Sequence, residues 1–256
     1  MYVVAIHSLK KEKETLSSTL AAVLGVTIYE ALARLRAPGN GPFIVAFSSE
    51  KERAAYLVER LQSEGFNASL LTAGEIEAES RALIARRFNL GKAELDVTTE
   101  KGESHSFAFK NIDLILRGTG IVRDVTTETV KNRSVSLGRA ALSGGMMITK
   151  TTKNLREVTT EERQAFFNIY AKDSSTVVFR ENALVYDSLG PELQPTRAAN
   201  FIHLIAGLRR CCPGVVYDER LLSRAGQAAL LGPSLSPEEN LAVAAALLSK
   251  LHRNEV

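Results

Sequence analysis

Residues 24–31 read Leu-Gly-Val-Thr-Ile-Tyr-Glu-Ala, and they place the end of one helix beside the beginning of another. Gly25 supplies the left-handed backbone conformation with which many helices end. Thr27 and Glu30 have the spacing of a capping box, in which each side chain accepts a hydrogen bond from the other residue's backbone amide. The stretch predicts one helix that ends near residue 24 and a second that begins after Thr27 and ends before Pro38.

Strands and a third helix surround these two helices in the sequence. Ser49 and Glu52 repeat the capping-box spacing ahead of a helix that ends at Gly65. Short apolar runs that predict strands are Tyr2–Ile6, Phe43–Phe47 and Asn67–Leu71. Residues 1–73 are therefore predicted to form a β-α-α-β-α-β module.

Residues 24–31, together with Ser49–Leu70, resemble the C-terminal domain of the bacterial ribosomal stalk protein, and the Clp-protease adaptor has a similar fold. The resemblance implies a small interaction module. The stalk domain recruits translation factors through a basic face on its first two helices, whereas Thr15–Ala33 contains no Lys or Arg. The resemblance therefore extends to the fold and not to factor recruitment.

The middle of the chain, residues 80–212, is predicted to be a mostly antiparallel β domain. Thr72–Ser80 is interpreted as a linker or domain boundary before it. A helix at Thr196–Arg210 is expected to close a curved sheet, partly open barrel or sandwich. Runs that favour strands, with one turn predicted at Arg117-Gly118, are Ala82–Leu90, Ala93–Thr99, Ser104–Phe109, Asp113–Arg117, Thr119–Thr129, Ala165–Tyr170 and Thr176–Tyr186.

This arrangement resembles a pleckstrin-homology-like domain with an insertion at 130–160. The residues that carry the resemblance are Phe109-Lys110-Asn111-Ile112-Asp113-Leu114-Ile115 and the apolar helix positions Phe201, Leu204, Ile205 and Leu208. An ordinary two-sheet α+β domain is the alternative. The predicted fold class for the whole chain is α+β.

The C-terminal extension, residues 213–256, is too apolar to be disordered. Ser236-Pro237 begins its last helix with a capping hydroxyl and a proline at the first helical position. One apolar face follows, made of Leu241, Ala244, Ala245, Leu248 and Leu251. Such a face usually covers the chain's own core, and less often a second protomer or a partner.

Composition limits the class of protein. The chain has 256 residues, 45% of them hydrophobic, and a formal net charge of +3. No run approaches the roughly 18–20 apolar residues that span a bilayer, and no basic segment precedes an apolar one at the N-terminus. We therefore expect a cytoplasmic protein with no transmembrane segment.

The segment 131–156 contains basic residues and no acidic residue. Its centre, residues 138–148, is apolar and rich in glycine. One interpretation is a protruding loop or hairpin that contacts phosphates, acidic lipid or a protein; the other is an apolar centre buried in the core or in a homo-oligomer, with solvated basic flanks. The candidate contact residues are Lys131, Arg133, Arg139, Met146, Met147, Lys150, Lys153 and Arg156.

The sequence carries no recognised catalytic, cofactor or metal motif, so we expect no cofactor and no enzyme activity. The four histidines are scattered, Asp218 and Glu219 are interpreted as solvated turn acids, and Cys211 and Cys212 as reduced thiols. We predict a non-catalytic binding or adaptor protein that contacts a protein partner or a second copy through the first helices or the basic segment. The alternative is a module for an anionic ligand, which is a nucleic acid, a nucleotide or a membrane surface. A third hypothesis is an enzyme whose site forms only between the folded domains, and a cleft there with two or more perturbed titratable groups would favour it.

Overall fold

The structure is a computed structural model, and it describes the chain except residues 8–12, 36–40, 136–148, 173–174 and 255–256. For residues 13–15, 122–161 and 254 it describes the backbone alone. The chain forms two compact units, one made of Met1–Gly120 with Gln164–Val256 and the other of Ile121–Arg163.

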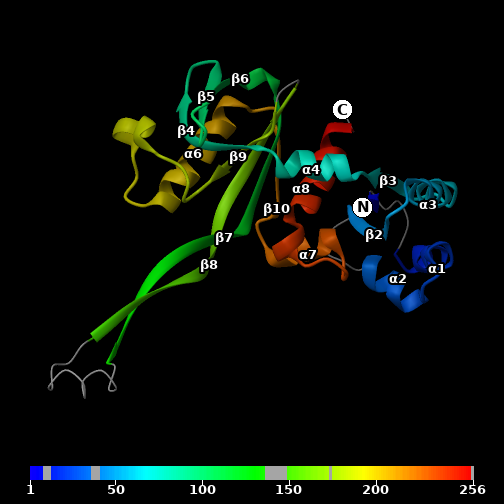
Figure 1. The fold of residues 1–256 in the computed structure, drawn as a ribbon. Coiled ribbons are helices and arrows are strands. Elements are labelled where there is room, and N and C mark those ends of the chain that lie inside the picture. The colour runs from blue at the N-terminus through cyan, green and yellow to red at the C-terminus, as the bar shows by residue number, and fades with distance from the viewer. Residues whose placement is uncertain (8–12, 36–40, 136–148, 173–174, 255–256) are drawn as a thin grey trace. The chain divides into compact units, whose positions relative to one another are not determined.

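Helices and strands are mixed along the chain, which confirms the α+β class (Figure 1). The strands are β1 Tyr2–His7, β2 Phe43–Ser48, β3 Asn67–Leu71, β4 Leu83–Leu90, β5 Glu94–Thr99, β6 Ser104–Ala108, β7 Ile112–Val135, β8 Thr149–Ala171, β9 Val177–Arg180 and β10 Val216–Leu221. The helices are α1 Lys13–Leu24, α2 Ile28–Leu35, α3 Lys51–Ser63, α4 Ala73–Ser80, η1 Phe109–Asn111, η2 Asp187–Glu192, α6 Arg197–Cys211, α7 Arg224–Leu231 and α8 Pro237–Asn254.

Strand β1 is the centre of a three-stranded antiparallel sheet in the order β2-β1-β3. Side chains alternate between the two faces of a strand, and β1 is apolar on both. Val4 and Ile6 pack in a cluster with residues of α1, α2 and α3, whereas Val3 and Ala5 pack in a second cluster on the other face. The sheet is therefore covered on both faces.

A seven-stranded sheet in the order β10-β7-β8-β9-β4-β5-β6 forms the second layer of strands. Strand β10 runs parallel to β7, and β4 runs parallel to β9, whereas β8 with β9 and β4 with β5 are antiparallel. Strands β10 and β6 are the two edges of this sheet, so it does not form a closed barrel. Helix α6 covers one face through Phe201 and Leu204, and Phe167 and Phe179 stack beneath it with ring centroids 4.5 Å apart.

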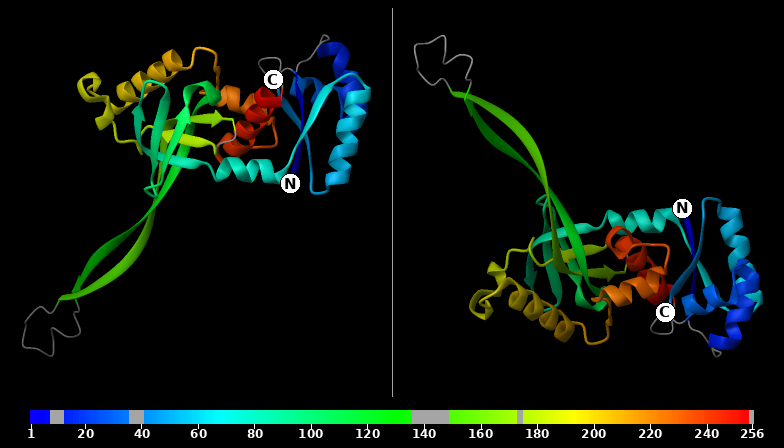
Figure 2. Two further views of the ribbon diagram at one scale, coloured as in Figure 1. Left: turned by 90° about the horizontal axis from the view of Figure 1, so that it is seen from above. Right: turned by 90° about the horizontal axis from the view of Figure 1, so that it is seen from below.

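Helix α8 lies between the two sheets (Figure 2). The buried cluster that contains its residues Val243–Leu248 also contains Val3 and Ala5 from the small sheet. Leu114 and Phe166 join the same cluster from the large sheet. The apolar face predicted for the last helix therefore packs inside the chain's own core, which is the commoner of the two expectations.

The helix caps agree with the sequence in one case and differ in another. In the predicted box, the Thr27 amide donates to Glu30 Oε2 (2.8 Å) and the Glu30 amide donates to Thr27 Oγ1 (3.2 Å). The box predicted from Ser49 is wrong, because Glu50 is the N-cap residue of α3 and makes no side-chain cap. Instead, Ser48 Oγ accepts a hydrogen bond from the Glu50 amide (3.0 Å).

The stretch Thr72–Ser80, interpreted as a linker or domain boundary, contains helix α4 (Ala73–Ser80) with Thr72 as its N-cap residue. Thr72 and Glu75 make a full capping box, with the Thr72 amide 2.7 Å from Glu75 Oε2. The local capping signal therefore prevails over the run of acidic residues that favoured a linker. Whether residues 1–73, 80–212 and 213–256 are separate domains stays a prediction.

The turn predicted at Arg117-Gly118 is also wrong, because β7 continues through it. A Cβ atom at Gly118 would lie 2.5 Å from Phe166 Cζ and 2.7 Å from Leu221 Cβ. The glycine is needed for close packing with the neighbouring strands β8 and β10 and not for a turn.

Gly118→Ala should lower the free energy of unfolding by about 1–3 kcal/mol, since the added methyl group overpacks the contact with Phe166 and Leu221. Gly74→Ala in α4 is the matched control, because no heavy atom lies within 4 Å of its added Cβ, and it should stabilise by up to about 1 kcal/mol. Urea denaturation of both variants checks this. Equal effects of the two substitutions would contradict the packing assigned to Gly118.

The second unit, Ile121–Arg163, is a two-stranded ribbon made by parts of β7 and β8, which are hydrogen-bonded neighbours. The 24 residues of β7 extend about 80 Å. The connection 136–148 reaches about 50 Å at most. It is too short to return the chain for a parallel pairing, so the ribbon is antiparallel.

No single helix among the described residues has both the length and the apolar character to span a membrane. Taken together, Leu16–Leu24 and Ile28–Leu35 meet those two criteria, with a bend of 116° between them.

Candidate functional site

A cleft of about 1510 Å3 lies in the first unit, where six parts of the chain meet. One side is made by α4 and the last two turns of α8. The other side is made by the residues that precede β5, the end of β6 with η1, and the ends of β7 and β8. The chain after α6, Cys211–Val216, completes it. Segments far apart in the sequence therefore contribute side chains to one cleft.

Glu75 connects α4 to α8 at this cleft. Its Oε2 belongs to the capping box with Thr72, and its Oε1 accepts a hydrogen bond from Lys250 Nζ (2.7 Å). Lys250 also donates to the Leu70 carbonyl (2.5 Å). Burial acts to raise the pKa of Glu75, but the hydrogen bonds from Lys250 and Thr72 outweigh it, so the pKa lies below its ordinary value.

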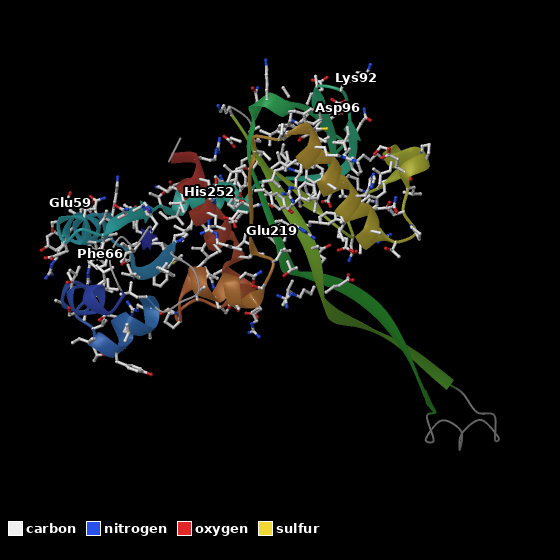
Figure 3. The ribbon with its side chains drawn as sticks, turned by 180° about the vertical axis from the view of Figure 1, so that it is seen from behind. Glu59, Phe66, Lys92, Asp96, Glu219 and His252 are labelled. Atoms are coloured by element: carbon white, nitrogen blue, oxygen red, sulfur yellow. The ribbon has the colours of Figure 1, made fainter. Side chains whose placement is uncertain are left out.

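Asp218 on β10 makes a second charged contact with α8. Arg220 binds both of its carboxylate oxygens through Nε, and His252 Nε2 lies 2.8 Å from Oδ2 (Figure 3 labels His252). Burial opposes ionisation of Asp218, but the hydrogen bonds from His252 and Arg220 hold its pKa well below the ordinary value. The interpretation of Asp218 as a solvated turn acid is wrong, since the residue is 7% exposed.

Arg253 makes the third contact of α8. Its Nε donates to Asp113 Oδ2 (3.3 Å), and its Nη2 donates to the carbonyl of Ala171 at the end of β8 (3.2 Å). The other carboxylate oxygen of Asp113 is buried and has no hydrogen-bond partner among the described atoms. Lys250, His252 and Arg253 are therefore all engaged with acidic residues on three different elements.

A buried polar network lies beside the cleft. Glu79 Oε1 accepts hydrogen bonds from the Tyr170 hydroxyl (2.5 Å) and from Asn168 Nδ2 (2.7 Å). Tyr170 is 1% exposed and Asn168 is 4% exposed. Burial raises the pKa of Glu79, and the two hydrogen bonds only partly offset it. Burial and then the charge of Glu79 raise the pKa of Tyr170, so its hydroxyl remains a donor.

The raised pKa of Glu79 gives stability a specific pH dependence. The folded protein holds the Glu79 proton at pH values where the unfolded chain, with a pKa near 4.5, has lost it. This contribution to stability is complete below the unfolded pKa and is lost as the pH rises through the raised folded pKa. Glu79→Gln removes the titration and keeps an acceptor, so its stability relative to wild type should rise with pH across that window.

Urea denaturation at a series of pH values measures this. Glu79→Ala should be destabilised at every pH by about 1–3 kcal/mol, because buried donors of Tyr170 and Asn168 lose their acceptor. Glu77→Gln on the exposed side of α4 is the control, and its curve should follow that of wild type. Parallel curves for Glu79→Gln and wild type would contradict a raised pKa.

Three lysines at the cleft were not singled out by the sequence. Lys92 precedes β5 (labelled in Figure 3), Lys110 lies in η1, and Lys172 follows β8; all three are exposed. Within the described part of the chain, no acidic side chain bonds to any of them. Because Lys172 is 62 residues beyond Lys110 in the sequence, no local pattern could have indicated that they line one cleft.

The structure places only some of the residues predicted from the sequence. Lys131 and Arg133 lie in β7, and Lys150, Lys153 and Arg156 lie in the neighbouring strand β8. Arg139, Met146 and Met147 lie outside the described residues, so whether the apolar centre is exposed or buried stays open. Cys211 and Cys212 are free thiols at the cleft, and burial raises the pKa of Cys212 to about 11, which disfavours its reactive thiolate.

The cleft is lined by four titratable groups with shifted pKa values, namely Glu75, Glu79, Tyr170 and Cys212. A carboxyl group with a raised pKa is a candidate acid or base. Here, however, the Glu79 carboxyl group already accepts hydrogen bonds from both Tyr170 and Asn168, as it would in a structural network. No group of three or more metal-ligating side chains occurs among the residues that the structure describes.

Comparison with protein-family models, with curated proteins and with solved structures gave no significant match to this chain. The resemblances to the stalk-protein domain, the Clp adaptor and the pleckstrin-homology-like domain therefore stay predictions.

Proposed function

We propose that this chain is a non-catalytic, cytoplasmic binding protein that holds the phosphate backbone of a nucleic acid with the β7–β8 ribbon. One observation carries the proposal: Lys131 and Arg133 lie on one strand of the ribbon, and Lys150, Lys153 and Arg156 lie on its neighbour. Two neighbouring strands bring the two basic groups together, although 16 residues separate Arg133 from Lys150.

The positions of these residues relative to the ends of the two strands support this grouping. Lys131 is four positions before the last residue of β7, and Lys153 is four positions after the first residue of β8. In an antiparallel pair, positions equally far from the connection lie near each other. Like charges on neighbouring strands repel each other unless an anion neutralises them, and phosphates provide such an anion.

The composition of the ribbon favours a nucleic acid over a membrane surface. Both of its strands are rich in threonine, with Thr126, Thr127 and Thr129 on β7 and Thr149, Thr151 and Thr152 on β8. Hydroxyl groups donate to phosphate oxygens, and a two-stranded ribbon has the width to enter the major groove of DNA. Membrane binding needs a large apolar face, which these polar strands do not supply.

Absence of turnover is supported by the arrangement beside the cleft. Glu79 is the one described carboxyl group there with a raised pKa, and it is bonded to Tyr170 and Asn168. An adaptor that contacts a protein or a second copy through the helices of residues 1–73 stays a prediction. Ile28 and Tyr29 at the beginning of α2 are exposed, at 58% and 80%.

Fluorescence anisotropy with a labelled 20-base-pair DNA duplex and an RNA of the same sequence tests the proposal. The test variant carries Gln at Lys131, Arg133, Lys150, Lys153 and Arg156. Wild type should bind at 50 mM salt and lose affinity steeply by 200 mM, with a log–log slope of up to about −4.5 if all five residues contact phosphates. The variant should bind at least about tenfold more weakly, with a shallower slope.

The matched control carries the same five-charge change at exposed positions outside the ribbon, namely Lys51, Arg53, Arg60, Arg87 and Lys101. It should bind like wild type. The proposal is overturned if wild type binds neither nucleic acid, if the two variants weaken binding equally, or if only vesicles that contain phosphatidylserine are bound. The last outcome would assign the ribbon to an acidic membrane surface.

A further inference from the structure

We infer that the cleft is a second, separate site, which binds a small polyphosphate or a phosphorylated small molecule through Lys92, Lys110 and Lys172. The inference does not depend on the ribbon, because every residue that lines the cleft belongs to the other unit of the chain.

Backbone hydrogen bonds bring the three lysines to one part of the cleft. Strands β5 and β6 pair with Glu94 opposite Ala108. The bond that follows runs from the Phe109 amide to the Ala93 carbonyl (3.0 Å), so Lys92 and Lys110, which adjoin these two residues in the sequence, lie on neighbouring segments. The position of each lysine is thus fixed by sheet pairing and not by a free loop.

The third lysine is tied to the same place. The Lys172 amide donates to the carbonyl of Asn111, the residue directly after Lys110, over 2.9 Å. The end of β8 therefore lies against η1. Lys92, Lys110 and Lys172, although separated widely in the sequence, come from three adjoining backbone segments that all line the cleft.

The charges of the cleft divide into two groups. The basic residues of α8 are engaged: Lys250 with Glu75 at 2.7 Å and Arg253 with Asp113 at 3.3 Å. The three lysines have no such partner in the described part of the chain. Four acidic residues line the cleft: Glu75 and Asp113 are paired with α8, Glu79 is bonded to Tyr170 and Asn168, and Glu94 makes no such contact with a described basic residue. Three ammonium groups and one carboxylate leave an excess of positive charge on this side of the cleft.

Neighbouring like charges destabilise a fold, so a purely structural cluster would be expected to contain a neutralising partner. A ligand with several negative charges supplies one. Lysine binds phosphate as a flexible point charge with three donors, which suits a phosphate chain that spans three separate lysines. A single negative charge could not neutralise all three.

The size and lining of the cleft leave room for more than the phosphates. At about 1510 Å3 it exceeds the usual range for small-molecule sites, which is roughly 300–1,000 Å3. Pro213, Val215 and Val216 form an incompletely buried apolar part of its lining. A phosphorylated molecule with an apolar or aromatic part, such as a nucleotide, therefore has surface to contact in addition to the lysines.

Isothermal titration calorimetry at 50 mM salt without divalent cations, with inorganic triphosphate and ATP as separate probes, tests the inference. Wild type should bind triphosphate, and K92Q/K110Q/K172Q should bind it at least about tenfold more weakly. Tighter binding of ATP than of triphosphate would show that the apolar lining contributes. Equal binding would assign the site to phosphate groups alone, and both results support a polyphosphate site.

Two controls make a negative result informative. K51Q/R53Q/R60Q changes three exposed basic residues of α3 and should bind both probes like wild type. The five-residue ribbon variant should also keep its affinity for triphosphate, which separates this site from the proposed nucleic-acid contact. Binding is compared only among variants whose thermal stability equals that of wild type. No binding of either probe by wild type, or equal weakening by both lysine and α3 variants, would overturn the inference.

Discussion

The packing of α8 between the two sheets is the interaction on which the rest of the structure depends. The helix contributes Val243–Leu248 to a buried cluster that also takes one face of β1 and one face of β7. Burial of these side chains is a favourable term that connects the small sheet to the large one, since apolar area removed from water contributes roughly 25 cal/mol per Å2. Exposing the apolar face of either sheet to water would cost free energy.

The position of α8 also determines which charges are free. Its last two turns carry Lys250, His252 and Arg253 to acidic partners on α4, β10 and β7. In these ion pairs the basic residues of α8 connect the helix to α4, β10 and β7. Excess positive charge consequently remains on the opposite side of the cleft, at Lys92, Lys110 and Lys172, and that excess is the basis for the second proposed site.

Local signals in the sequence predicted local structure well. The helix boundaries at Thr27 and Pro237 and the strands of the small sheet follow from caps and from short apolar runs. The sequence was misleading where a residue's environment comes from distant segments. Gly118 was taken for a turn because Phe166 and Leu221, whose side chains occupy the space of its Cβ, cannot be identified as neighbours from spacing alone.

The same reason explains what was missed at the cleft. Asp218 was taken for a solvated acid, although Arg220 two residues later on the strand was an available signal for a same-face partner. No comparable signal joins Lys92 to Lys172, because only sheet pairing brings them together. For the basic segment, composition did indicate its unusual charge, while its arrangement as two neighbouring strands required the structure.

Native-state hydrogen exchange of Leu248→Ala is the most direct test of the role of α8. Leu248 is fully buried in the shared cluster, so the substitution should cost about 2–5 kcal/mol. The control is Leu193→Ala, whose parent side chain is 53% exposed. If α8 couples the two sheets, slowly exchanging amides of β1 and β7 should lose protection together and by the same free energy. Loss confined to one sheet, with the other unchanged, would contradict it.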